Sequence, residues 1–113
     1  MIYLLYGNKN FLIDNELITL SQPFDPMNIS KFDFDNESPQ NAMEDAKTIS
    51  LFGDKKLIIC THANMFTGAT SKDIDIIEEY LNHPNPDTTI IFTVNNEKID
   101  ERKKITKLIK KKG

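Results

Sequence analysis

The chain has 113 residues, one cysteine and a formal net charge of −3. This length fits a single domain with a buried core, and one cysteine excludes an internal disulfide. No apolar run approaches the ~20 residues that a membrane-spanning helix needs, so a membrane partner is not expected. A reducing cytoplasm is the expected compartment.

Four short apolar runs are predicted to be β-strands. They comprise Ile2–Tyr6, a weaker run around Ile29, Phe32 and Phe34, then Lys56–Thr61 and Thr88–Val94. The third run, which contains Cys60, is apolar on both faces, as is typical of an interior parallel strand.

The stretches between these runs are predicted to be helices. Residues 10–20 place Ile13, Leu17 and Leu20 on one helical face. A second helix begins at Ser38-Pro39, a hydroxyl N-cap followed by proline at the first helical position. Its apolar stripe consists of Ala42, Met43, Ala46 and Ile49.

Two further helices are expected towards the end of the chain. One is capped by Ser71 and has a buried face made of Ile74, Ile77, Tyr80 and Leu81. The other covers residues 100–112, and residues 21–27, with two prolines, are expected to be a loop. The alternation predicts an α/β fold, a parallel sheet with helices on both faces. With no strand after the last helix, the chain is expected to be truncated before its last strand.

The turn after the first strand is where a nucleotide would bind in such a fold. A phosphate loop needs Gly, four residues, Gly, Lys and then Ser or Thr. Counting from Gly7, those last three positions hold Leu12, Ile13 and Asp14. ATP use and a nucleotide cofactor are therefore not expected.

Other candidate sites are weak in the sequence. His62 and His83 lack the spacing of a zinc pair, and Asp33, Asp35 and Glu37 lack the glycine of a calcium loop. No metal site and no catalytic nucleophile are therefore predicted. Seven of the fourteen lysines and arginines lie in residues 102–112, which suggests either phosphate contacts or, more simply, the exposed face of an amphipathic helix.

The most informative segment is apolar where a polar turn is expected. Leu51 and Phe52 follow the helix stripe that ends at Ile49, immediately before Gly53. Two interpretations remain open for this segment. It either packs the helix end onto the sheet or protrudes as an apolar wedge that marks a protein interface.

At these residues the chain resembles the N-terminal domain of the delta subunit family of bacterial DNA polymerase III, the clamp-loader subunit. The matching stretches, in the same order along the chain, are residues 2–8, 11–13, 49–52, 56–59, 81–92, 98–100 and 102–104. The helix 1–strand 2 connection is shorter here than the family pattern. The resemblance covers essentially the whole chain.

The resemblance implies an AAA+ type fold over residues 1–113, with strand order 5-1-4-3-2 and a degenerate ATP site. It implies that Ile49, Leu51 and Phe52 enter a pocket on the sliding clamp (the beta subunit) and favour its opening in DNA replication, without catalysis by this subunit. Other loader subunits would bind through regions outside this chain, and DNA only through the assembled complex. Without strand 5, Ile2–Tyr6 is expected to present an unpaired edge that favours self-association.

Two alternative functions come from the residues themselves. One is a diverged nucleotide-binding domain that uses an unrecognised site. The other is a nucleic-acid-binding module that works through the C-terminal lysines.

Overall fold

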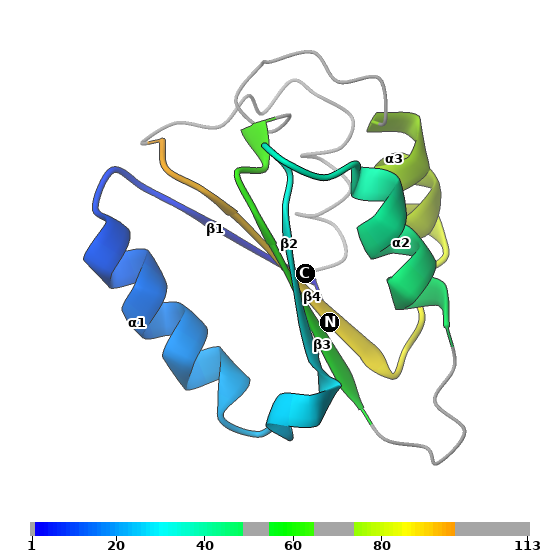
Figure 1. Cartoon of the computed structure of the whole chain (residues 1–113), viewed down its shortest axis with the longest axis horizontal. Helices are drawn as coiled ribbons and strands as arrows, with labels where there is room; N and C mark the ends of the chain where they lie inside the picture. Colours follow the sequence, from blue (N-terminus) through cyan, green and yellow to red (C-terminus); the bar gives the residue numbers. More distant parts are fainter. Residues whose placement is uncertain (1, 49–54, 65–73, 97–113) are drawn as a thin grey trace.

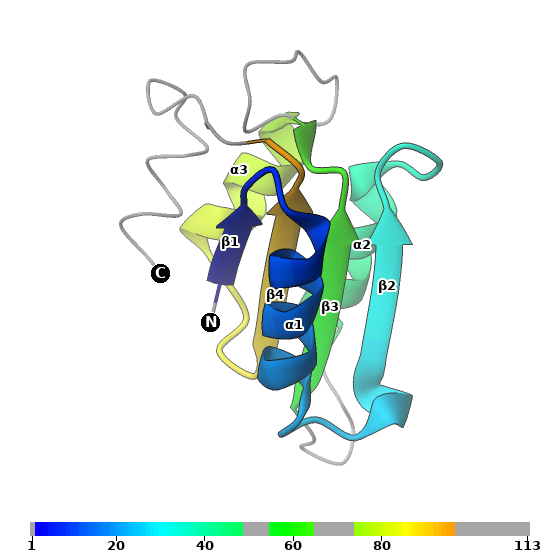
Figure 2. The ribbon, with the colours of Figure 1, turned by 90° about the vertical axis from the view of Figure 1, so that its left-hand side faces the viewer.

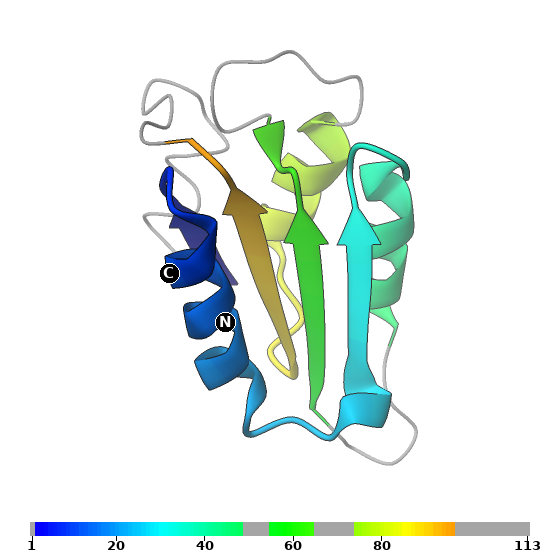
Figure 3. The same ribbon diagram turned by 60° about the vertical axis from the view of Figure 1, so that its left-hand side comes forward.

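The computed structural model describes residues 2–48, 55–64 and 74–96. In this part of the chain, four strands form one parallel sheet: β1 (Ile2–Tyr6), β2 (Ile29–Asp33), β3 (Lys56–Thr61) and β4 (Thr88–Val94). Their order across the sheet is β1-β4-β3-β2 (Figure 3). The predicted strands and the parallel α/β arrangement are confirmed, except that β2 ends at Asp33, so Phe34, predicted to lie in this strand, is in the turn that follows it.

Helices cover both faces of the sheet. Helix α1 (Asn10–Ser21) lies on one face, and α2 (Pro39–Lys47) and α3 (Ile74–Asn82) lie on the other (Figures 1 and 2). Helix α2 begins as predicted, because the Ser38 hydroxyl oxygen accepts a hydrogen bond from the Gln40 backbone N–H at 3.2 Å and Pro39 occupies the first helical position.

Each face of the sheet has its own core. The larger core joins α2 and α3 to the sheet, and its fully enclosed members include Ala42, Met43, Ala46, Ile58, Cys60, Ile77, Leu81, Ile90 and Phe92. The smaller core consists of Leu57, Ile59 and Ile91, against which Leu17 and Leu20 of α1 pack. The helix faces predicted from sequence are therefore the faces that meet the sheet.

Some expectations need correction, and others lie outside the described residues. Ser21 belongs to α1 and not to a loop, and Pro26–Asn28 forms a 3-10 helix because the Asp25 carboxylate accepts a hydrogen bond from the Met27 N–H. The Ser71 cap and the helix over residues 100–112 lie outside the described residues.

Strand β1 lies at one edge of the sheet, as the expected strand order requires. Within the described residues β1 pairs only with β4, so the order matches the AAA+ arrangement without its fifth strand. Self-association through this edge stays a prediction. In the described part of the chain, no helix is long and apolar enough to cross a membrane.

Phe92→Ala should destabilise the domain strongly. Phe92 is fully enclosed in β4, and its ring lies 6.4 Å from the Phe34 ring, centroid to centroid. Removing a core phenylalanine costs about 3–5 kcal/mol in the free energy of unfolding. Denaturant unfolding measures this loss, and Phe11→Ala is the control, because Phe11 is 61 % exposed and should change stability by about 0.5 kcal/mol or less. Equal effects of the two substitutions would contradict the assignment of this core.

Candidate functional site

The turn between β1 and α1 is too short to form a phosphate loop. Helix α1 begins at Asn10, so only Gly7, Asn8 and Lys9 separate it from β1. Leu12 and Ile13, at the positions of the second glycine and the lysine, are already in the first turn of α1. Ile13 is buried and Leu12 is 55 % exposed. The backbone therefore lacks the open loop of N–H groups that surrounds a nucleotide's phosphates.

A small cavity of about 220 Å³ lies beside this turn, at the carboxyl edge of the sheet. Its lining includes Asn10, Asp14 and Thr93, and it contains no lysine or arginine among the described residues. It is smaller than the roughly 300–1,000 Å³ of usual small-molecule sites. The nearest titratable group of α1 is acidic, so its charge would repel a polyphosphate.

The three residues predicted to bind the clamp, Ile49, Leu51 and Phe52, lie outside the described residues. The structure does describe both ends of that segment, at Thr48 and at Lys55. These ends lie at the amino edge of the sheet, where α2 stops and β3 begins. The structure therefore shows where residues 48 and 55, which flank the segment, join the fold.

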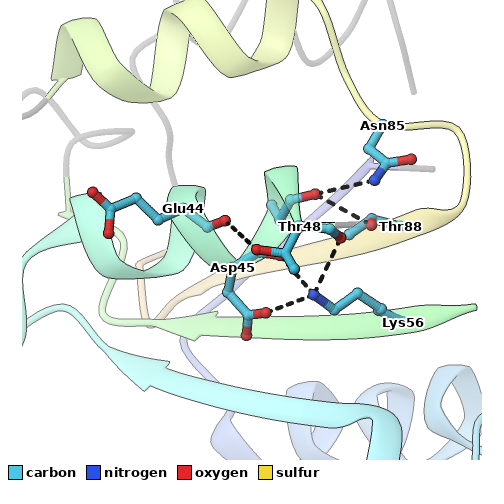
Figure 4. Close-up of polar contacts among 7 residues, drawn as sticks. Glu44, Asp45, Thr48, Lys56, Asn85 and Thr88 are labelled. Carbon is cyan, nitrogen blue, oxygen red and sulfur yellow. Dashed lines mark hydrogen bonds and ion pairs between the residues drawn. The ribbon is translucent and has the colours of Figure 1, made fainter. Parts of the chain in front are cut away.

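Lys56 connects the two ends of this segment. Its ammonium group donates to the Asp45 carboxylate and to the Asp45 backbone carbonyl, both at 2.7 Å, and lies 3.4 Å from the Thr48 carbonyl oxygen (Figure 4). The Lys56 side chain is only 18 % exposed. A cation at a helix C-terminus also interacts favourably with the helix dipole, so this ammonium group fixes where α2 ends.

Asn85 in the α3–β4 connection and Thr88, the first residue of β4, complete the cap of α2. The Asn85 amide and the Thr88 hydroxyl both donate to the Ala46 carbonyl oxygen, at 3.4 and 3.3 Å (Figure 4). The carbonyl groups in the last turn of a helix have no partner within the helix. Here Lys56, Asn85 and Thr88 supply those partners, so β3, β4 and α2 meet at one polar junction in an otherwise apolar layer.

His62 has partners that the sequence did not indicate. It lies against Asp33, the last residue of the neighbouring strand β2, and Asp35, which follows that strand, and not against His83. Glu37, the third acidic residue of this stretch, binds the backbone instead: its carboxylate accepts a hydrogen bond from the Asp33 backbone N–H at 3.3 Å. The sequence could have predicted this contact only if the strand order were known. The carboxyl ends of adjacent parallel strands meet at one edge of a sheet, and β2 and β3 are adjacent.

Comparisons with known proteins agree with this architecture. The family model for the delta subunit of DNA polymerase III matches residues 3–113. DNA polymerase III subunit delta of Bacillus subtilis (strain 168) is 30 % identical over 120 residues, which cover 97 % of this chain and 35 % of that protein. The solved structure of the Bacillus subtilis DNA clamp loader delta protein aligns with a TM-score of 0.86 at 30 % identity, again over 97 % of this chain and 35 % of the other.

Lys56→Met should destabilise the junction at the end of α2. The substitution keeps most of the aliphatic stem and removes the ammonium donor, so the Asp45 carboxylate and two carbonyl oxygens lose a charged partner. Hydrogen bonds to charged groups contribute about 1.5–3 kcal/mol, and we expect a loss of about 2 kcal/mol in denaturant unfolding. Lys31→Met, at an exposed position of β2, is the control. Unchanged stability in Lys56→Met would show that the ammonium group does not hold this junction.

Proposed function

This chain belongs to the delta subunit family of DNA polymerase III, and from that premise we propose that it is the sliding-clamp-binding domain of a clamp-loader subunit. The chain spans about a third of the length of the relatives that it matches. Residues 1–113 would then serve as the N-terminal AAA+-like domain of a longer protein. In this proposal the domain acts in DNA replication in the cytoplasm, and it contacts other loader subunits through regions outside this chain.

The proposed contact with the clamp is the segment that contains Ile49, Leu51 and Phe52. An aromatic and two aliphatic side chains within four residues match the composition of interface anchors, in which a few apolar groups fill a pocket on the partner. The observation that supports this choice is the polar junction around Lys56, which fixes the chain on both sides of the segment. Fixed ends lower the conformational entropy lost on binding, so they favour affinity.

The proposed action on the clamp is mechanical. A clamp that exchanges between a closed and an open shape shifts towards the shape that binds the segment more tightly. The shift is limited by the difference in binding free energy between the two shapes, and it requires no covalent step. The domain would therefore be non-catalytic by itself.

The same proposal holds that this domain does not use ATP. The short β1–α1 turn, the position of Ile13 against the sheet and the absence of a lysine or arginine around the described cavity all support it. A diverged nucleotide-binding domain is less compatible with that geometry. A nucleic-acid-binding module would depend on residues 102–112, which lie outside the described part of the chain.

The double substitution Leu51→Ala, Phe52→Ala should abolish most clamp binding while melting changes little. Losing a buried aromatic anchor costs 2 kcal/mol or more, which is a loss of about thirtyfold or more in affinity. Binding to the sliding clamp of the same organism and thermal melting are measured on the same sample. If both residues pack into the core instead, melting falls sharply, because core Leu→Ala and Phe→Ala changes each cost about 2–5 kcal/mol.

The chain offers a matched control for this experiment. Phe11 and Leu12 form a second adjacent pair of the same composition, exposed at 61 % and 55 % on α1. Phe11→Ala, Leu12→Ala should leave both melting and clamp binding nearly unchanged. Equal clamp binding in the Leu51, Phe52 variant and the wild type would refute the proposed contact.

Mg·ATP should not bind this domain. Isothermal calorimetry at millimolar nucleotide is expected to give only the heat of dilution, because the groups that hold phosphates are replaced by Leu12, Ile13 and Asp14. A saturable isotherm would contradict the proposal that nucleotide is not used. In that case a melting temperature that rises with nucleotide concentration would confirm binding to the folded state.

A further inference from the structure

We propose that Asp33, Asp35 and His62 bind one divalent ion of the zinc class at the carboxyl edge of the sheet. The site is separate from the residues that flank the proposed clamp contact, because Thr48 and Lys55 lie at the amino edge. Asp33 is the last residue of β2, Asp35 follows it in the turn towards α2, and His62 follows β3 directly. One ligating atom from each of the three side chains lies within 4.8 Å of the other two.

The distances fit a single ion with small adjustments. The Nδ1 atom of His62 lies 2.5 Å from an oxygen of Asp33 and 3.6 Å from an oxygen of Asp35. Ligand atoms about 2.1 Å from a tetrahedral ion lie roughly 3.4 Å apart. The His62–Asp33 separation would lengthen on binding, and the His62–Asp35 separation of 3.6 Å is already near that value. The side chains of His62, Asp33 and Asp35 are 43 %, 36 % and 54 % exposed, so an ion can enter from solvent.

Neighbouring groups orient both carboxylates towards His62. The Asn36 side-chain amide donates a hydrogen bond to the Oδ2 of Asp33 at 2.9 Å, and the Asp35 backbone N–H donates one to the Oδ1 of Asp33 at 3.0 Å. Asn64 contacts the Oδ1 of Asp35 at 3.5 Å, which leaves the Oδ2 facing the imidazole. Hydrogen bonds of this kind fix the geometry of metal ligands.

The charge of the cluster also favours a cation. The Asp33 and Asp35 carboxylates both converge on the His62 ring, with their ligating oxygens within 4.8 Å of each other, and the approach of two like charges is unfavourable unless a cation lies between them.

The ligand set selects the class of ion. An imidazole with two carboxylates suits zinc, cobalt or nickel, whereas calcium needs six to eight oxygen ligands and magnesium an octahedral oxygen shell. Three protein ligands leave a fourth position for water. The ion would tie the turn after β2 to the residue after β3, next to the small cavity that His62 also lines.

The test is calorimetric titration of zinc chloride into the full 113-residue chain, without an affinity tag and after treatment with a chelator. We expect one saturable site and a melting temperature that rises with zinc. His62→Ala and Asp35→Asn should each weaken binding about tenfold or more, since even residues that only orient ligands contribute 10–100-fold. The isosteric Asp35→Asn change keeps the experiment interpretable if His62→Ala fails to fold.

The chain supplies a control for the imidazole. His83 is the second of its two histidines, is exposed and follows α3, so His83→Ala should retain the site. Cys60 is fully buried and cannot compete as a ligand in the folded state. Absence of saturable zinc binding, binding that survives both Asp35→Asn and His62→Ala, or tighter binding of calcium than of zinc would each overturn the proposal.

Discussion

The fold depends on covering both faces of a parallel sheet. Strands β3 and β4 lie inside the sheet, and their apolar side chains are enclosed on both sides. Burial of this kind requires helices on each face, because apolar surface left in water costs about 25 cal/mol per Å². Strand–helix–strand connections meet that requirement, and they make the strands parallel. All the amino ends of the strands therefore lie at one edge of the sheet, and all the carboxyl ends lie at the other. The polar junction around Lys56 lies at the amino edge, and the cluster of Asp33, Asp35 and His62 lies at the carboxyl edge.

The sequence predicts this layer well because its patterns are local. Lys56–Thr61 and Thr88–Val94 are dense in β-branched residues, and their observed bounds equal the predicted ones. Two adjacent residues, Ser38 and Pro39, are enough to predict where α2 begins. The 3-10 helix at Pro26–Asn28 was missed, although Asp25-Pro26 is itself a turn signal, because two nearby prolines favoured a loop.

The contacts between elements were less accessible from the sequence. Lys56 reaches Asp45 across eleven positions, and His62 reaches Asp33 across twenty-nine. Neither pairing follows from spacing, because each depends on which strands are neighbours and on where a helix ends. The motif analysis was more informative where it compared positions with a known chemical requirement, as at Leu12 and Ile13. The composition of the segment with Leu51 and Phe52 left open whether it packs onto the sheet or forms a protein interface, and it did not show how the fold holds the ends of the segment.

Strand β3 joins two places with different chemistry. It begins at Lys56, next to the apolar segment, and ends at Thr61, next to His62. Six residues of extended chain separate those places by roughly 20 Å. The proposed protein partner and the proposed ion would therefore not compete for space.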